Sequence, residues 1–286
     1  MQRREVLNTP ARPGSLVATR DGTRLYWTQW GPARGPTILF LNSAGIPIQM
    51  WDYQMVAFAE QGYRCIGVDR RGHGRSDHAA SGYDIDTFAD DLADFIETLD
   101  LHSLTIITHS MASGELARYL SRHGSARVAR IVLLAPTTPF LLKTADNPDG
   151  IPEEIFATLR NSWRKDYLRW IDDNTDAFFA TPETSPGMRR WLAGMLGQFP
   201  VRFAIALNEA LTRTDFRGDL RKISVPTLVV HGDLDASAPL ALTGIRTAAL
   251  IPGSRLEIYE GVAHGLMYTH MDRLHADILG FIQDTQ

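Results

Sequence analysis

The chain has little cysteine, no long apolar run and no strong charge of either sign, and each absence excludes a class of protein. Its 286 residues contain one cysteine, Cys65, and a single cysteine forms neither an intrachain disulfide nor a cysteine metal site. No apolar run approaches the roughly 20 residues that cross a bilayer. The opening residues Met1–Glu5 lack the apolar segment of a signal peptide. We therefore expect a cytoplasmic protein without a membrane partner.

Charge and composition point away from nucleic acid and toward an ordinary globular domain. Lysine and arginine total 29 against 33 aspartate and glutamate residues, so the net charge is -4, which does not favour a polyanionic partner. The apolar content of 44% and the charged content of 22% are typical of globular domains. A chain of 286 residues is long enough for one large α/β domain with an insertion. Nothing in the composition sets an oligomeric state.

Short apolar runs alternate with helical patterns along most of the chain. The runs are rich in β-branched residues and predict buried strands, and the first two flank Asp21-Gly22, a good hairpin turn. Strands alternating with helices predict an α/β fold with a mostly parallel eight-stranded sheet and helices on both faces. The expected strands are Ser15–Thr19, Arg24–Trp30, Thr37–Leu41, Arg64–Asp69, Leu104–Thr108, Arg130–Leu134, Pro226–His231 and Leu256–Tyr259.

The alternation stops between residues 139 and 218, a segment rich in tryptophan and phenylalanine and without a strand pattern. We expect a helical cap inserted over the carboxyl edge of the sheet, with residues 1–138 and 219–286 forming the core domain. Most of the aromatic side chains in the cap should form its own core, and only a few should face a pocket.

One serine lies where a strand turns sharply into a helix. Leu104–Thr108 is the expected strand and the residues from Gly114 onward form the helix, which leaves few residues for the turn. A serine on such a turn exposes its hydroxyl beyond the sheet, and the usual pattern is G-x-S-x-G. Thr108 and Ala112 replace the two glycines here, and Thr108 is the bulkier. Ser110 is therefore a candidate nucleophile, and the alternative is a serine that caps an ordinary helix.

Acyl transfer by serine needs a base that takes the hydroxyl proton and an acid that orients this base. Ser110, Asp235 and His264 follow the chain order serine, acid, histidine, and each comes just after an expected strand. We assign His264 as the base and Asp235 as the acid. The alternatives are a surface-loop role for His264 and the choice of Asp233 as the acid, although Asp233 also suits a turn residue that bonds the backbone. Such chemistry requires no metal or organic cofactor.

A tetrahedral intermediate also needs two backbone N–H groups aimed at its oxyanion. Met111 follows the serine at a helix N-terminus and should supply one of them. Ala44, in the loop Asn42–Gly45 after a strand, should supply the other, and the alternative for this loop is a simple turn. Four candidate substrate-binding residues surround these groups: Ser43, Gly45, Trp163 and Leu266.

The residues after several strands resemble those of the α/β-hydrolase superfamily over essentially the whole chain. Asp69–Ser76 resembles the D-x-R-G-x-G-x-S turn of that superfamily, whose role is mainly structural. The chain is most similar to the bacterial cofactor-free haloperoxidase and arylesterase group. This likeness rests on Glu115–Tyr119, Pro139–Thr144, Asp146–Gly150, Thr214–Arg217 and the tail 250–272. The resemblance supports Asp235 as the acid, because that group places it second in an H-G-D-x-D pattern, and it implies hydrolysis of small esters with perhydrolysis as a side activity.

Two departures from that group concern the expected site. The group has His-Gly-aromatic-Pro where this chain has Asn42–Gly45, and the proline associated with perhydrolysis falls at Gly45. The Asn-Ser-x-Gly loop, followed by Met50-Trp51-Asp52, instead resembles that of enol-lactonases. Thr108 and Ala112 at the serine turn are the second departure. The loop at Gly45 predicts weak perhydrolase activity at most.

The sequence predicts a serine hydrolase that cleaves small carboxylic esters through an acyl-enzyme. A lactonase or enol-lactonase with the same residues and a weak perhydrolase are the alternative enzymes. A ligand receptor is the alternative from another class, because hydrolase folds can be reused for binding. The expected partner is a small-molecule ester or lactone.

Overall fold

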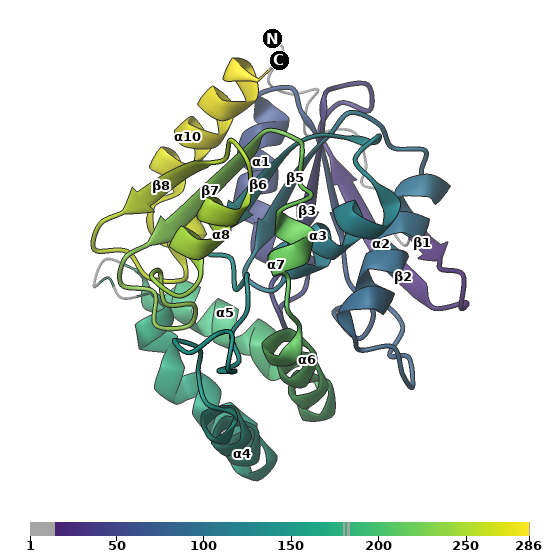
Figure 1. Ribbon diagram of the computed structural model, residues 1–286. Helices are drawn as coiled ribbons and strands as arrows, with labels where there is room; N and C mark the ends of the chain where they lie inside the picture. Colours follow the sequence, from purple (N-terminus) through teal and green to yellow (C-terminus); the bar gives the residue numbers. More distant parts are fainter. Residues whose placement is uncertain (1–14, 180, 182–183, 286) are drawn as a thin grey trace.

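The computed structural model describes residues 15–179, 181 and 184–285, so the expectation drawn from Met1–Glu5 lies outside the described residues. An eight-stranded sheet in the order β1-β2-β4-β3-β5-β6-β7-β8 forms the centre of the molecule (Figure 1). The strands are β1 (Ser15–Ala18), β2 (Arg24–Trp30), β3 (Thr37–Leu41), β4 (Arg64–Val68), β5 (Leu104–His109), β6 (Val128–Leu134), β7 (Thr227–Gly232) and β8 (Arg255–Tyr259).

The sheet is antiparallel at one edge and parallel elsewhere. The β1–β2 hairpin turns at Gly22, whose φ of 85° suits glycine, and β2 also pairs antiparallel with β4. Every other neighbouring pair of strands is parallel. The predicted α/β fold and its mostly parallel eight-stranded sheet are therefore confirmed.

Alternate residues of the central strands pack into two separate cores. In β3, Leu39 and Leu41 join one apolar cluster and Ile38 and Phe40 join the other, as the two-residue repeat of a strand requires. The first core includes α2 (Ile85–Thr98) and α3 (Ala112–His123), and the second includes α1 (Asp52–Glu60) and α10 (Met271–Asp284). Helices thus cover both faces of the sheet, which explains why its central strands are almost entirely apolar.

Short helices complete the core. A 3-10 helix, Ile48–Trp51, precedes α1, while α8 (Gly244–Leu250) lies between β7 and β8 in the chain. The helix α9 (Leu266–Thr269) follows β8 and leads into α10. No helix in the described part of the chain combines the length and apolarity that a bilayer crossing requires.

Three helices of the segment between β6 and β7 lie together at one end of the sheet (Figure 1). They are α4 (Glu153–Phe179), α5 (Pro186–Gly197) and α6 (Val201–Arg213), while the short α7 (Arg217–Leu220) packs beside α3. The long helix α4 is interrupted at Asp166, whose φ of -160° and ψ of 89° are not helical. The Asp166 carboxylate accepts a hydrogen bond from the Arg169 backbone at 2.9 Å, so it caps the second half of α4.

Candidate active site

Asp235 and His264 lie in hydrogen-bond contact at the carboxyl ends of β7 and β8. The distance from His264 Nδ1 to Asp235 Oδ2 is 2.6 Å, and both residues are buried. Since an ionised carboxylate can only accept, Nδ1 carries the proton and Nε2 is left as the basic nitrogen. The pair therefore has the tautomer that a general base requires.

Asp235 is held as an anion by four donors. Its Oδ1 accepts from the backbones of Ser237 at 2.9 Å and Ala238 at 2.8 Å, and His231 Nε2 lies 3.1 Å from Oδ2 beside His264. Burial raises the pKa of Asp235, but the electrostatic attraction to His264 and the hydrogen bonds from His231 and His264 outweigh it and hold the pKa well below its ordinary value. Asp235 thus remains ionised and orients the imidazole.

Asp233, the other acid considered from the sequence, bonds elsewhere. Its Oδ1 accepts from the backbone N–H of Gly261 at 2.7 Å, which ties the end of β7 to the loop after β8. Asp233 therefore acts as a turn residue whose side chain bonds the backbone, as its position directly after the strand predicts.

Ser110 lies on the turn between β5 and α3 in a left-handed backbone conformation. Its φ is 57°, a value that costs a residue with a side chain energy and is found at functional turns. The Ser110 backbone N–H is anchored to the carbonyl of Leu134 in β6 at 2.9 Å. Within the described chain, its hydroxyl makes no hydrogen bond. Thr108 fits the strand with its hydroxyl 3.5 Å from the Val132 carbonyl, and Ala112 opens α3.

The loop after β3 is fastened by a buried histidine. His73 Nδ1 lies 3.0 Å from the Arg71 carbonyl, and the Gly45 N–H donates to His73 Nε2 at 3.0 Å. Burial lowers the pKa of His73 well below its ordinary value, which keeps Nε2 neutral and able to accept. Asn42 also donates to the Ile46 carbonyl across the loop. The turn that includes His73 therefore shapes the loop, as its structural role in the family implies.

Ala44 and Met111 are the two residues expected to supply oxyanion donors. No acceptor for either backbone N–H occurs among the described residues. Met111 is fully buried and directly precedes α3, where the helix dipole favours negative charge.

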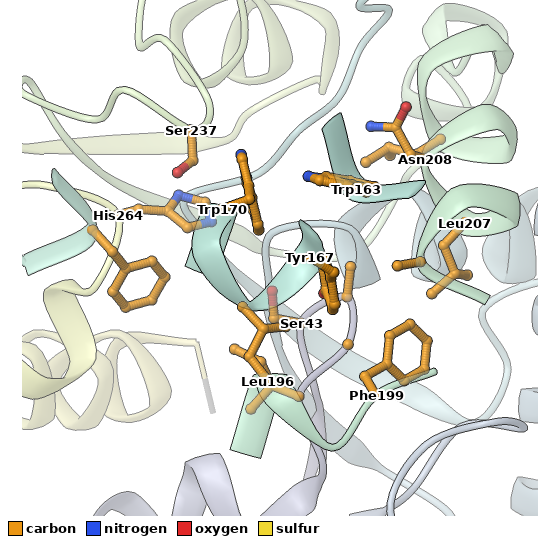
Figure 2. A pocket seen from close by; sticks show the side chains of 16 residues that line it. Ser43, Trp163, Tyr167, Trp170, Leu196, Phe199, Leu207, Asn208, Ser237 and His264 are labelled. Atoms are coloured by element: carbon orange, nitrogen blue, oxygen red, sulfur yellow. The ribbon is translucent and has the colours of Figure 1, made fainter. Parts of the chain in front are cut away.

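A mostly apolar cavity of about 170 Å³ opens beside His264 (Figure 2). Ser43, Gly45 and Trp163, three of the four residues expected to bind substrate, line it. Leu266 does not: it is fully buried at the start of α9 and packs in the core on the α10 side. Most of the remaining lining comes from the segment between β6 and β7: Tyr167, Trp170, Phe178, Leu196, Phe199, Ala204, Leu207, Asn208 and Leu211.

The end of α4 is joined to the loop that holds His264. The Gly265 N–H donates to the Phe178 carbonyl at 2.8 Å, and the ring of Phe178 packs edge-on against His264 with centroids 5.4 Å apart. A Cβ at position 265 would come within 2.6 Å of the Phe178 ring, so glycine permits this contact. His109, which does not line the cavity, also packs against His264, with ring centroids 4.5 Å apart, and its ring meets that of Phe178 edge-on.

Three residues that support this site were not assigned from the sequence. His231 Nε2 contacts the Asp235 carboxylate. His109 Nε2 lies 3.0 Å from the backbone carbonyl of His264. Phe178, at the end of α4, packs its ring against the His264 imidazole. His231 is the histidine of the H-G-D-x-D pattern that ends at Asp235, and adjacency to Ser110 is the sequence signal for His109. The described residues include no cluster of three or more histidine, cysteine or acidic side chains able to hold a metal ion.

A mostly parallel sheet with a serine turn after β5 and an acid–histidine pair after β7 and β8 defines the α/β class of hydrolases. The chain belongs to the alpha/beta hydrolase fold family, whose family model matches residues 36–271.

Individual relatives indicate which group within this family the chain resembles. A non-heme chloroperoxidase of Kitasatospora aureofaciens is 37% identical, with 93% of this chain and 98% of that protein aligned. A bifunctional esterase/perhydrolase of Acinetobacter calcoaceticus is 34% identical over 93% of this chain and 99% of its own. The crystal structure of a Bacillus anthracis bromoperoxidase superposes with a TM-score of 0.89, 31% identity, and coverage of 94% and 99%. A 3-oxoadipate enol-lactonase of Acinetobacter baylyi is more distant, at 27% identity over 77% of this chain and 79% of its own. The resemblance to the haloperoxidase group is confirmed.

Gly45 offers a first prediction about the loop after β3. Its φ of 74° disfavours a side chain, and a Cβ there would lie 2.7 Å from Leu196 Cδ1 and 3.1 Å from Phe199. We expect Gly45→Ala to lower the free energy of unfolding by about 1–3 kcal/mol. Thermal or urea unfolding measures this change.

Gly253→Ala is the matched control, because Gly253 has a φ of 69° and a Cβ added there would meet nothing within 4 Å beyond its chain neighbours. It should cost only the backbone strain, about 1 kcal/mol. If both variants lost the same free energy of unfolding, the predicted steric clash at Gly45 would be contradicted.

Proposed function

We propose that the protein hydrolyses small carboxylic esters through an acyl-enzyme formed on Ser110. The observation that carries the proposal is the 2.6 Å contact between His264 Nδ1 and Asp235 Oδ2, which leaves Nε2 basic on a residue that lines an apolar cavity. The left-handed turn at Ser110 supports it. The esterase named among the relatives supports the same reaction class.

In the proposed reaction, Ser110 Oγ attacks the ester carbonyl carbon while His264 Nε2 takes its proton. The oxyanion accepts hydrogen bonds from the N–H groups of Ala44 and Met111. When the C–O bond breaks, the His264 imidazolium gives its proton to the leaving alcohol. Water then attacks the acyl-enzyme with His264 again as base, and the free acid leaves as Ser110 regains its proton.

We propose further that residues 139–218 act as a cap on the core formed by 1–138 and 219–286. The support is that α4, α5 and α6 supply most of the cavity lining, while the core supplies Ser43, Ser237 and His264. The cavity of about 170 Å³ is close to the size that encloses one benzene molecule. The cap therefore favours short acyl or aryl groups.

The proposal is tested by labelling with a fluorophosphonate, which reacts only with an activated serine and needs no knowledge of the substrate. We expect a single adduct, mapped by peptide mass spectrometry to Ser110. Turnover of p-nitrophenyl acetate and butyrate, beside a panel of small lactones, should accompany it and rank esters against lactones. An unlabelled Ser110 in folded protein, or an adduct on another serine, would contradict the assignment.

Perhydrolysis is a second candidate function, since the names of the chloroperoxidase and esterase/perhydrolase relatives favour it. Hydrogen peroxide would replace water as the attacking group on the acyl-enzyme and release a peracid. Proline has a φ near -65°, whereas Gly45 has a φ of 74°. The backbone of this loop therefore differs from that of a loop with proline at the same position. We expect peracid formation from acetate and peroxide to be slower than hydrolysis of p-nitrophenyl acetate; a faster rate would make perhydrolysis the main activity.

A further inference from the structure

The cavity has a polar wall that the proposed chemistry does not use. His264 and Ser237 lie on one side of it, and Trp163 and Asn208 lie on the other (Figure 2). Most of the lining between them is aliphatic or aromatic. Polar groups placed in an otherwise apolar pocket set the orientation and the identity of its ligand.

The orientation of the Asn208 amide is fixed by a buried arginine. Arg160, which is 3% exposed, donates from Nη1 to Asn208 Oδ1 at 2.9 Å. A guanidinium has no acceptor, so the amide oxygen must face it and the Nδ2 group must face away. In Figure 2 that nitrogen points toward Trp163. No acceptor for Nδ2 is present in the described part of the protein.

Trp163 forms the apolar part of the same wall. It is 8% exposed, and its indole Nε1 is buried, so the ring and not the nitrogen faces the cavity. The rings of Tyr167 and Trp170 pack against it edge-on, with centroids 5.6 and 5.0 Å away. The Asn208 Nδ2 group is therefore the donor that this wall presents to a ligand.

The charges behind this wall favour a neutral ligand group over a carboxylate. Arg160 is paired with Glu153 at 2.5 Å and lies 3.5 Å from Glu209, so its positive charge is already compensated. The donor of the wall, Asn208 Nδ2, is uncharged. The wall therefore suits a carbonyl oxygen, which accepts a hydrogen bond and carries no charge.

We propose that the cavity selects esters whose chain carries a second, neutral carbonyl oxygen, bound by the Nδ2 group of Asn208. The inference rests on the proposed esterase function, because the ester group must lie at His264 while the second carbonyl reaches the opposite wall. The preferred substrate class is thus short oxo-acyl esters rather than simple alkyl esters.

The test compares p-nitrophenyl hexanoate with the 4-oxo and 5-oxo hexanoates, which replace one methylene by a carbonyl. We expect kcat/KM for the better oxo ester to exceed that for hexanoate by about tenfold or more in the wild type. Asn208→Asp keeps an oxygen for Arg160 but presents an acceptor to the substrate carbonyl. It should abolish the preference, so that kcat/KM for the oxo esters equals that for hexanoate to within about threefold.

Asn161→Asp is the matched control, since exposed Asn161 accepts from Arg164 Nη1 at 3.0 Å in the same manner but does not line the cavity. It should leave the preference unchanged. No preference for either oxo ester in the wild type, or a preference kept in Asn208→Asp, would overturn the proposal.

A binding measurement separates this inference from the esterase itself. Cyclohexanone and methylenecyclohexane differ only by oxygen against CH2, and tryptophan fluorescence reports their binding without turnover. We expect the wild type to bind cyclohexanone at least about fivefold more tightly, and Asn208→Asp to lose that difference. Equal affinities in the wild type refute the carbonyl site. If ester turnover is absent while the ketone preference is present, the esterase assignment fails and the carbonyl site stands.

Discussion

Ser110→Ala should lower kcat/KM for p-nitrophenyl butyrate by about 10⁴-fold or more. Without the hydroxyl no acyl-enzyme forms, and the remaining rate comes only from water attack assisted by His264 and the backbone donors. The substitution removes one oxygen atom from a residue that is 7% exposed, and that hydroxyl bonds to nothing else in the described chain. We therefore expect the melting temperature to change little, and steady-state kinetics with thermal unfolding to separate the two effects.

Ser121→Ala is the matched control for this variant. Ser121 lies in the same helix, α3, where its hydroxyl accepts from Lys222 at 3.0 Å and takes no part in the cavity lining. Its turnover should equal that of the wild type. Retained butyrate hydrolysis in Ser110→Ala would exclude the acyl-serine mechanism, whatever the fold.

Asp235→Asn should lower kcat by about 10³–10⁴-fold with a smaller change in KM. The reason lies in the donors around the side chain. Ser237 and Ala238 both donate to Oδ1, so an amide must turn its nitrogen toward His231 and His264. An N–H₂ group facing Nδ1 forces the His264 proton onto Nε2, and this tautomer cannot take a proton from Ser110.

Asp233→Asn provides the comparison for that variant, since it keeps an oxygen for the Gly261 N–H. We expect its kcat within about threefold of the wild type, because a neutral oxygen still makes that hydrogen bond. If Asp233→Asn lost more activity than Asp235→Asn, the acid would have been assigned to the wrong residue of the pair. Esterase kinetics across both variants decide between the two acids.

The strands could be predicted because their signal is local. Thr37–Leu41 is apolar at every position but the first and becomes β3 with the same bounds, and each of the other expected strands overlaps an observed one. The spatial order, in which β4 lies between β2 and β3, depends on contacts between distant segments that no single run encodes. The Asp166 interruption of α4 was also not foreseen, because Trp163, Tyr167 and Trp170 continue a helical spacing across it.

The residues of the candidate site also fall into two groups: those that a local sequence pattern predicts, and those that only the fold brings together. Ser110, Asp235 and His264 could be selected because each follows a strand and the carboxyl ends of parallel strands share one edge. Asn208 and Arg160 could not, because their pairing joins α6 to α4 and neither residue belongs to a motif. Leu266 is predicted from the sequence to bind substrate, yet the start of α9 turns it into the core.

The contacts of Phe178 with Gly265 and His264 limit how the helices over the cavity can be exchanged among relatives. A chimera that replaces 139–218 with the corresponding segment of another family member must place a backbone carbonyl against the Gly265 N–H and a ring against His264 at the same positions. Specificity is therefore not a freely transferable module in this protein. A functional chimera must take the last turn of α4 and residues 264–266 from the same parent. Its recombination breakpoints must therefore not separate Phe178 from Gly265 and His264.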